Sequence, residues 1–238
     1  MPITTPSIKV NSVKNYGGKV ILHGDNFDEA FKHANELVKK EGYTFIHPYD
    51  DIDVIAGQGT VGKELIEQIS ADIDAIFVPV GGGGLLAGLG TYVKALSPKT
   101  KIIGVEPDDA ACLKLALDNN KRLSLSEVGL FADGVAVKQI GKETFSLIRE
   151  WIDDVVTVSV DEMCASVQDT FQETRTIPEP AGALALAGLK KYTKSKGLKN
   201  KNLIAINSGA NDCKNLKNYH EIICEMKDYY KAVSYTHL

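Results

Sequence analysis

Three glycine-rich segments contain the residues best suited to bind a phosphate or a nucleotide. The first, Gly57-Gln58-Gly59-Thr60-Val61-Gly62-Lys63-Glu64, comes close to the phosphate-binding loop of nucleoside triphosphatases. That loop needs a hydroxyl at its last position to bind Mg²⁺, whereas Glu64 places a carboxylate there that would repel phosphate. We therefore expect a structural loop that leads into a helix, with Lys63 in solvent.

Four consecutive glycines, Gly81 to Gly84, form the second segment. They follow an apolar run and precede a helical pattern, so their free backbone N–H groups can converge on one phosphate monoester. Two alternatives stay open. One is a dinucleotide site, whose glycine fingerprint fits Gly82, Gly84 and Ala87; Glu106, at the end of the next predicted strand, would then hold the ribose. The other is a purely structural turn.

The third segment, Ser208-Gly209-Ala210-Asn211, follows the last apolar run of the chain. The hydroxyl of Ser208 can contact a ligand at the end of a strand. It can also cap the next segment, because Ser and Asn both favour turns. The residue types alone leave both interpretations open.

These segments must be positioned by the elements around them, which alternate between short β-branched runs and helical periodicity. We predict strands at residues 19–22, 43–46, 75–80, 101–106, 155–158 and 203–206. We predict helices at residues 27–38, 61–69, 85–96, 110–117, 142–151, 161–173 and 181–192. Asp25 or Asn26 would cap the first of these helices and Gly42 would end it, while Asp161 would cap the sixth.

This alternation predicts an α/β fold with mostly parallel sheets and helices on both faces. Ligands bind such sheets at the carboxyl ends of the strands. Gly81 directly follows one predicted strand, and Ser208 lies two residues after the end of another. We therefore expect them at the same edge of the sheet.

Composition excludes several classes of protein. The 238 residues are 44% hydrophobic and 24% charged, which is a globular composition, and the net charge of −4 offers no basic surface to nucleic acid. The uncharged residues 75–93 are long enough to cross a membrane, but Pro79 and the glycines predict a strand, a turn and a helix instead. The scattered cysteines form no C-x-x-C pair, which predicts no structural metal site and a reducing, cytoplasmic location.

Six segments taken in order resemble the biosynthetic threonine dehydratases (threonine ammonia-lyases), which are pyridoxal-phosphate enzymes of the tryptophan-synthase-β fold. The segments are residues 2–6, 56–60, 78–85, 129–137, 179–183 and 208–211. The resemblance runs from Met1 to about Asn211 and, as an ordered set, is highly specific. It implies an incomplete copy of pyridoxal-phosphate fold type II.

The resemblance implies a site for pyridoxal 5'-phosphate. The glycine loop would hold its phosphate, Ser208 would hydrogen-bond its pyridine nitrogen, and Gly134 and Glu179 would line the pocket. A neutral hydroxyl at the nitrogen suits β-elimination, which needs only a modest electron sink. The full set of implied cofactor-binding residues is Gly81, Gly82, Gly83, Gly84, Leu85, Gly134, Glu179 and Ser208.

The implied reaction is the α,β-elimination that converts L-threonine to 2-oxobutanoate and ammonia in isoleucine biosynthesis. The implied partner is an amino acid, threonine or serine, and the intact enzyme would be a homo-tetramer, with no nucleic-acid or membrane partner. An L-serine dehydratase or serine racemase of the same fold is an alternative. A second alternative is a non-catalytic protein that binds pyridoxal phosphate or only a partner subunit.

Two departures from the family pattern stand out. Some relatives bind a divalent ion through a Glu, a backbone carbonyl and an Asp, which fall here on Glu106, Ala110 and Cys112; a cysteine is a poor ligand for Mg²⁺ or Ca²⁺, so we expect no metal site. The family's Schiff-base lysine lies in a Ser-x-Lys-x-Arg-Gly-Ala motif that this chain lacks, and Ser7-Ile8-Lys9-Val10 is only a superficial echo. We therefore expect this chain alone to be inactive.

The resemblance also divides the chain. Residues 1–49 would be the second half of a small domain, and residues 50–213 would be the large cofactor-binding domain. Residues 214–231 would begin a linker to an absent regulatory domain. Residues 232–238 look like a non-native tail.

Overall fold

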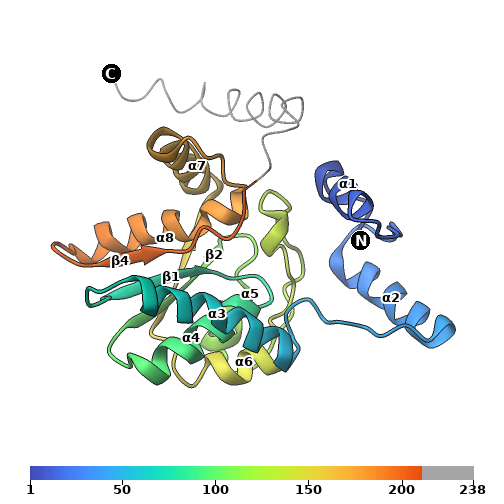
Figure 1. Cartoon of the computed structure of the whole chain (residues 1–238), viewed down its shortest axis with the longest axis horizontal. Helices are drawn as coiled ribbons and strands as arrows, with labels where there is room; N and C mark the ends of the chain where they lie inside the picture. Colours follow the sequence, from blue (N-terminus) through green and yellow to red (C-terminus); the bar gives the residue numbers. More distant parts are fainter. Residues whose placement is uncertain (211–238) are drawn as a thin grey trace.

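The computed structural model describes residues 1–210, so the predicted linker at 214–231 and the predicted tail at 232–238 lie outside the described residues. A four-stranded sheet in the order β3-β2-β1-β4 forms the centre of the molecule (Figure 1). Its strands are β1 (Ala75–Pro79), β2 (Lys101–Pro107), β3 (Asp154–Val158) and β4 (Leu203–Ala205). All three strand pairings are parallel, which confirms the predicted α/β class.

Helices cover both faces of this sheet (Figure 1). One face carries α3 (Ile52–Gln68), α4 (Gly84–Leu96), α5 (Cys112–Asp118) and α6 (Lys142–Ile148). The other carries α7 (Val160–Thr174) and α8 (Pro180–Lys196). Strand β1 shows why the sheet is sandwiched: Ile76 and Val78 face one core cluster, Phe77 faces the other, and all three are fully buried. A strand buried on both faces reads as a continuous apolar run rather than an alternating one.

The first glycine-rich segment is not a loop, and this prediction was wrong. It lies inside α3, which begins at Ile52 rather than at Val61. One glycine on each helix lets α3 pack closely on α4. A Cβ on Gly62 of α3 would lie 3.0 Å from the Leu89 carbonyl oxygen, and one on Gly88 of α4 would lie 2.2 Å from the Ile55 carbonyl oxygen. Close packing of the two helices offsets the low helix propensity of glycine. Lys63 is exposed, as expected.

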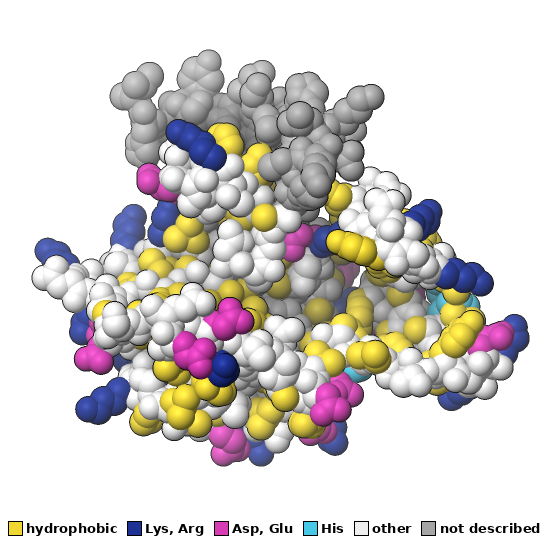
Figure 2. Space-filling view, viewed as in Figure 1, with side chains coloured by type: hydrophobic (Ala, Val, Ile, Leu, Met, Phe, Trp, Pro, Cys, Tyr) yellow, Lys and Arg dark blue, Asp and Glu magenta, His cyan; other side chains and the backbone are white. Residues whose placement is uncertain are grey.

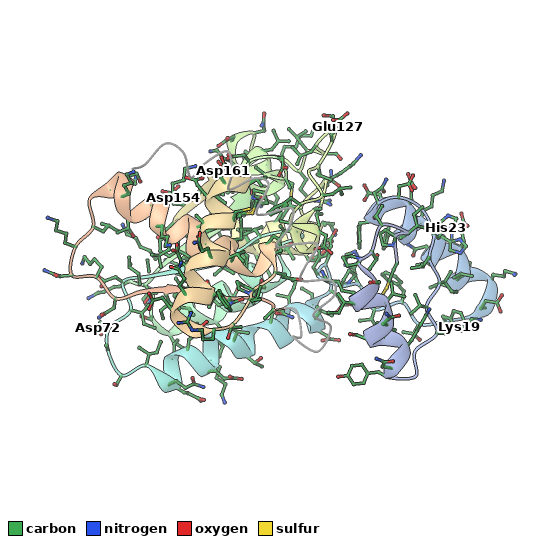
Figure 3. All side chains as sticks on the ribbon, turned by 90° about the horizontal axis from the view of Figure 1, so that it is seen from above. Lys19, His23, Asp72, Glu127, Asp154 and Asp161 are labelled. Atoms are coloured by element: carbon green, nitrogen blue, oxygen red, sulfur yellow. The ribbon has the colours of Figure 1, made fainter. Side chains whose placement is uncertain are left out.

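The N-terminal lobe, which we define as residues 1–49, contains α1 (Ser7–Asn15) and α2 (Phe27–Glu41). Figure 3 shows this lobe, with the labelled Lys19 and His23, standing beside the sheet. The side chain of Asn26 accepts a hydrogen bond from the Glu29 N–H, so Asn26 rather than Asp25 caps α2, and Gly42 ends the helix with a φ of 72°.

The strands predicted at residues 19–22 and 43–46 do not form. A strand needs a neighbouring strand with which to form a ladder of hydrogen bonds. Near the first segment, the backbone hydrogen bonds run instead to the N-terminus: the Met1 amino group donates to the Ile21 carbonyl, and the His23 N–H donates to the Met1 carbonyl. Large hydrophobic side chains of the lobe therefore remain at the surface (Figure 2). They include Ile3, Tyr16, Tyr43 and Ile46.

The other predicted elements form at their expected places with shifts at the ends, whereas α1 and a short 3₁₀ helix at Asp133–Val135 were not predicted. Ser159, not Asp161, caps α7, because its hydroxyl and the Glu162 side chain form a reciprocal capping box. Helix α6 ends at Ile148, three residues before the predicted end. Among residues 1–210, no helix is long and apolar enough to cross a membrane.

Candidate cofactor site

A cavity of about 410 Å³ lies between the N-terminal lobe and the carboxyl ends of β1 and β4. The eight residues predicted to bind the cofactor all line it: Gly81, Gly82, Gly83, Gly84, Leu85, Gly134, Glu179 and Ser208. Its other walls come from residues that the sequence did not single out for binding, including Phe27, Tyr49, Gln58, Asp133 and Val135. The parallel pairing of β1 with β4 brings Gly81 and Ser208, 127 positions apart, to one edge of the sheet.

The glycine loop leaves a row of backbone donors free. Among the described residues, no acceptor receives the N–H of Gly82, Gly83, Gly84 or Leu85. These groups open helix α4, whose N-terminus carries partial positive charge. The Gly82 carbonyl is held from the opposite side by the Thr144 hydroxyl at 2.8 Å, which orients the Gly82–Gly83 peptide. Such a row suits one phosphate group.

Only glycine fits this loop. A Cβ on Gly82 would lie 2.3 Å from the ring of Tyr49, and one on Gly81 would lie 2.9 Å from the Val135 Cα. Gly83 has a φ of 92°, a backbone conformation that is strained for any residue with a Cβ. The absence of side chains leaves space beside the free N–H groups of the loop, which a purely structural turn would not need.

Glu179 and Ser208 reach the cavity from the far side of the loop. The carboxylate of Glu179 lies between two glycines: a Cβ on Gly209 would be 2.7 Å from its Oε1 and a Cβ on Gly134 would be 3.4 Å from the same atom. Glu179 precedes Pro180 at the first turn of α8, and its own N–H donates to the Gly209 carbonyl at 3.2 Å. The Ser208 hydroxyl makes only a 3.5 Å contact to the Ala181 carbonyl, so it can still bond to a ligand.

Residues 1–209 match a family model described as "Pyridoxal-phosphate dependent enzyme". The chain belongs to this family. It is 56% identical over 211 residues to "Threonine dehydratase biosynthetic, chloroplastic" of Arabidopsis thaliana, covering 89% of this chain and 36% of that protein. It is 55% identical to "L-threonine dehydratase biosynthetic IlvA" of Haemophilus influenzae, covering 41% of that protein. The chain thus spans well under half the length of these curated relatives.

Solved structures agree with these sequence matches. The processed form of threonine deaminase isoform 2 from Solanum lycopersicum superposes with a TM-score of 0.86 and 48% identity, over 93% of this chain and 64% of that one. Serine racemase from Dictyostelium discoideum superposes with a TM-score of 0.76 and 32% identity, over 89% of this chain and 67% of that one. The matches favour the threonine enzymes over the serine enzymes.

The cavity of this pyridoxal-phosphate family member fits its cofactor. The free N–H groups and the side-chain-free loop suit a phosphate, and a hydroxyl and a carboxylate face it across about 410 Å³. Residues of the lobe complete the walls, namely Phe27, Pro48 and Tyr49. Tyr49 lays its ring on Gly82, and burial together with the charge of Asp50 raises the pKa of its hydroxyl. Asp50 in turn caps α6, accepting the N–H groups of Lys142 and Glu143 at 2.8 Å each.

Lys9 is the site neighbour that the sequence reasoning set aside. Its Nζ lies 2.8 Å from Asp133 Oδ2 and 3.2 Å from Glu179 Oε2. Burial lowers the pKa of Lys9, but the hydrogen bond to Asp133 and the charge of Glu179 outweigh burial, so the pKa is raised above its usual value. The sequence signal was weak, because Lys9 is 124 residues from Asp133 and 170 from Glu179.

Glu106 does not line the cavity, so the acid that the dinucleotide alternative assigned to the ribose lies outside the site. The Glu106 carboxylate is fully buried and accepts the N–H groups of Leu113 at 2.7 Å and Lys114 at 2.9 Å, which caps α5. Burial raises its pKa to about 7, against the opposing effect of these two hydrogen bonds. Cys112 is also buried, and its thiol donates to the Gly81 carbonyl at 3.5 Å. No group of three or more potential metal ligands occurs within residues 1–210.

Proposed function

We propose that this chain is the cofactor-binding part of an L-threonine ammonia-lyase, which converts L-threonine to 2-oxobutanoate and ammonia. The observation that carries the proposal is the single cavity that collects the glycine loop, Glu179 and Ser208. Identities of 55 and 56% to biosynthetic threonine dehydratases support the same activity. Because the chain covers less than half of those proteins, the activity and the substrate of the whole enzyme remain part of the proposal.

In this proposal each group of the cavity has one task. The N–H groups at the start of α4 would bind the phosphate. The Ser208 hydroxyl would donate a hydrogen bond to the pyridine nitrogen and would leave that nitrogen unprotonated. When bound, pyridoxal phosphate supplies an electron sink for the bonds at the amino acid's α-carbon. Glu179 would place a carboxylate next to the bound cofactor, and Tyr49, whose ring lies against Gly82, would exclude water from the loop.

We also propose that the chain as given lacks the lysine that would bind the cofactor covalently and move the α-proton. No lysine occurs among the described residues that line the cavity. Lys9, which lies just behind two lining residues, is held by their carboxylates with a raised pKa. A protonated amine is not a nucleophile, so Lys9 does not replace the family's lysine.

The first test is binding of pyridoxal phosphate to the purified chain, followed by absorbance, with Gly83→Ala as the disrupting variant. Alanine there meets both a φ of 92° and a 2.8 Å contact to Ile140 Cδ1. Gly197→Ala is the matched control, because Gly197 also has a positive φ of 60° but nothing within 4 Å of its Cβ. We expect tight binding by the wild type and the control, and none by Gly83→Ala. Equal binding by all three proteins would contradict the site.

The second test adds L-threonine or L-serine to the chain loaded with pyridoxal phosphate. We expect no keto acid, and no lysine carrying the cofactor after borohydride reduction and peptide mapping. Keto acid from either amino acid would disprove the absence of a working lysine. The serine enzymes remain the second candidate because serine racemase shares the fold at 32% identity. Release of keto acid or racemisation with serine alone would favour them.

The proposed division of the chain assigns residues 1–49 to a small domain and residues 50–213 to a large one. It is supported by the position of the cavity between the N-terminal lobe and the sheet. A homo-oligomeric enzyme in the cytoplasm is proposed from the resemblance and from the scattered cysteines. The names of the plant relatives place those proteins in the chloroplast.

A further inference from the structure

Lys9 connects the N-terminal lobe to the cavity. It projects from α1, which Figure 1 shows beside the sheet rather than within its helical layers. Its ammonium group meets Asp133, in the short 3₁₀ helix η1 (Asp133–Val135), and Glu179, at the start of α8. Both acids line the cavity. One side chain of the lobe therefore touches two separate walls of the site.

The charges that line the cavity give this contact an electrostatic role in addition to joining the lobe to the site. Its lining contains two carboxylates, Asp133 and Glu179, and no Lys, Arg or His among the described residues. Within residues 1–210, the ion pairs of both acids are made with Lys9 alone. Without Lys9, an anion would have to enter a site that already holds two uncompensated negative charges. The positive potential left would come only from helix N-termini at the cavity, those of α4 and α8, among the described residues.

We propose that Lys9 is a positioning residue for the cofactor. It balances the charges of Asp133 and Glu179, so that an anionic ligand can bind, and it holds the Glu179 carboxylate between Gly134 and Gly209. The proposal rests on the proposed function, because it takes pyridoxal phosphate as the anion. The pair of contacts, at 2.8 and 3.2 Å to two acids on different elements, sets the direction of the Glu179 side chain.

The test compares binding of pyridoxal phosphate to the full 238-residue chain and to Lys9→Met, Lys9→Arg and Lys14→Met. Lys14→Met is the matched control, because Lys14 lies on the same helix and makes no ion pair within the described residues. We expect Lys9→Met to weaken binding by about fivefold, since a partly exposed ion pair is worth about 1 kcal/mol. Lys9→Arg should keep most of the affinity and Lys14→Met all of it.

Two further measurements separate charge balance from simple structural damage. Pyridoxal, which lacks the phosphate, should lose less affinity than pyridoxal phosphate in Lys9→Met. Adding Asp133→Asn to Lys9→Met should restore binding of pyridoxal phosphate, because one of the two uncompensated charges is removed. If Lys9→Met alone does not unfold cooperatively, the double variant is compared with Asp133→Asn alone in the same binding measurement.

The outcomes distinguish the two proposals. If the wild type binds no pyridoxal phosphate, the proposed function fails. If the wild type binds and Lys9→Met binds equally well, the role of Lys9 is overturned and the function stands. Equal losses for pyridoxal and pyridoxal phosphate, with no recovery in the double variant, would also overturn it, because they would show a structural effect without charge balance.

Discussion

The buried carboxyl of Glu106 should make the stability of this protein depend on pH between about 4.5 and 7. Its pKa rises from an ordinary 4.5 to about 7 because the side chain is fully buried on the inner side of α5. A tenfold change in a protonation equilibrium is about 1.4 kcal/mol, so this rise corresponds to roughly 3 kcal/mol. The folded protein therefore binds the Glu106 proton more tightly than the unfolded chain does.

The sign follows from this difference. Below the unfolded pKa, both states hold the proton and the stabilising contribution is fully present. As pH rises through 4.5 to about 7, the unfolded chain releases the proton first and the contribution is lost. Above that range Glu106 is charged in both states, and its cap on the Leu113 and Lys114 N–H groups offsets only part of the desolvation cost.

The assay is urea unfolding at intervals from pH 4.5 to 8, on the wild type and on Glu106→Gln. Glutamine keeps one acceptor for the α5 N–H groups and cannot titrate. As pH rises, the free energy of unfolding of the wild type should therefore fall by roughly 3 kcal/mol relative to that of the variant. Glu127→Gln is the control, because Glu127 is exposed at the surface (Figure 3). A constant difference between wild type and Glu106→Gln across this range would refute the reasoning.

Two other predictions concern the packing that positions the site. Gly88→Ala should lower the free energy of unfolding by about 1–3 kcal/mol, because the new Cβ would lie 2.2 Å from the Ile55 carbonyl oxygen. Gly57→Ala, in the same helix pair, has open space around its Cβ and should raise the free energy of unfolding by about 0.5–1 kcal/mol. Urea unfolding measures both, and equal effects of the two variants would contradict the packing. Asp50→Ala should lower the free energy of unfolding by about 1–2 kcal/mol, because α6 loses its cap. It should also weaken binding of pyridoxal phosphate, measured by absorbance, by releasing Tyr49 from the loop. Unchanged binding would show that the α6 cap does not support the site.

The amino-acid sequence by itself determined the strands of the central sheet and the position of the glycine loop. Residues 75–80 are apolar without alternation because β1 is buried on both faces, and this signal is local. The four glycines predict an anion site, because their backbone N–H groups lie at the N-terminus of a helix. Glu179, Gly134 and Ser208 came from the resemblance, and the structure brings them to the same cavity, while their roles stay predictions.

The tertiary structure decided what depends on a partner far along the chain. Residues 19–22 and 43–46 have strand-like sequences but no neighbouring strand within the described residues, and a lone strand cannot satisfy its backbone. Residues 57–64 are part of α3, which packs on α4 and approaches its backbone most closely at Gly62. Lys9 became a site neighbour only when folding brought α1 beside two acids more than 120 positions away. Local periodicity carries no information about such contacts, because they form only when the chain folds.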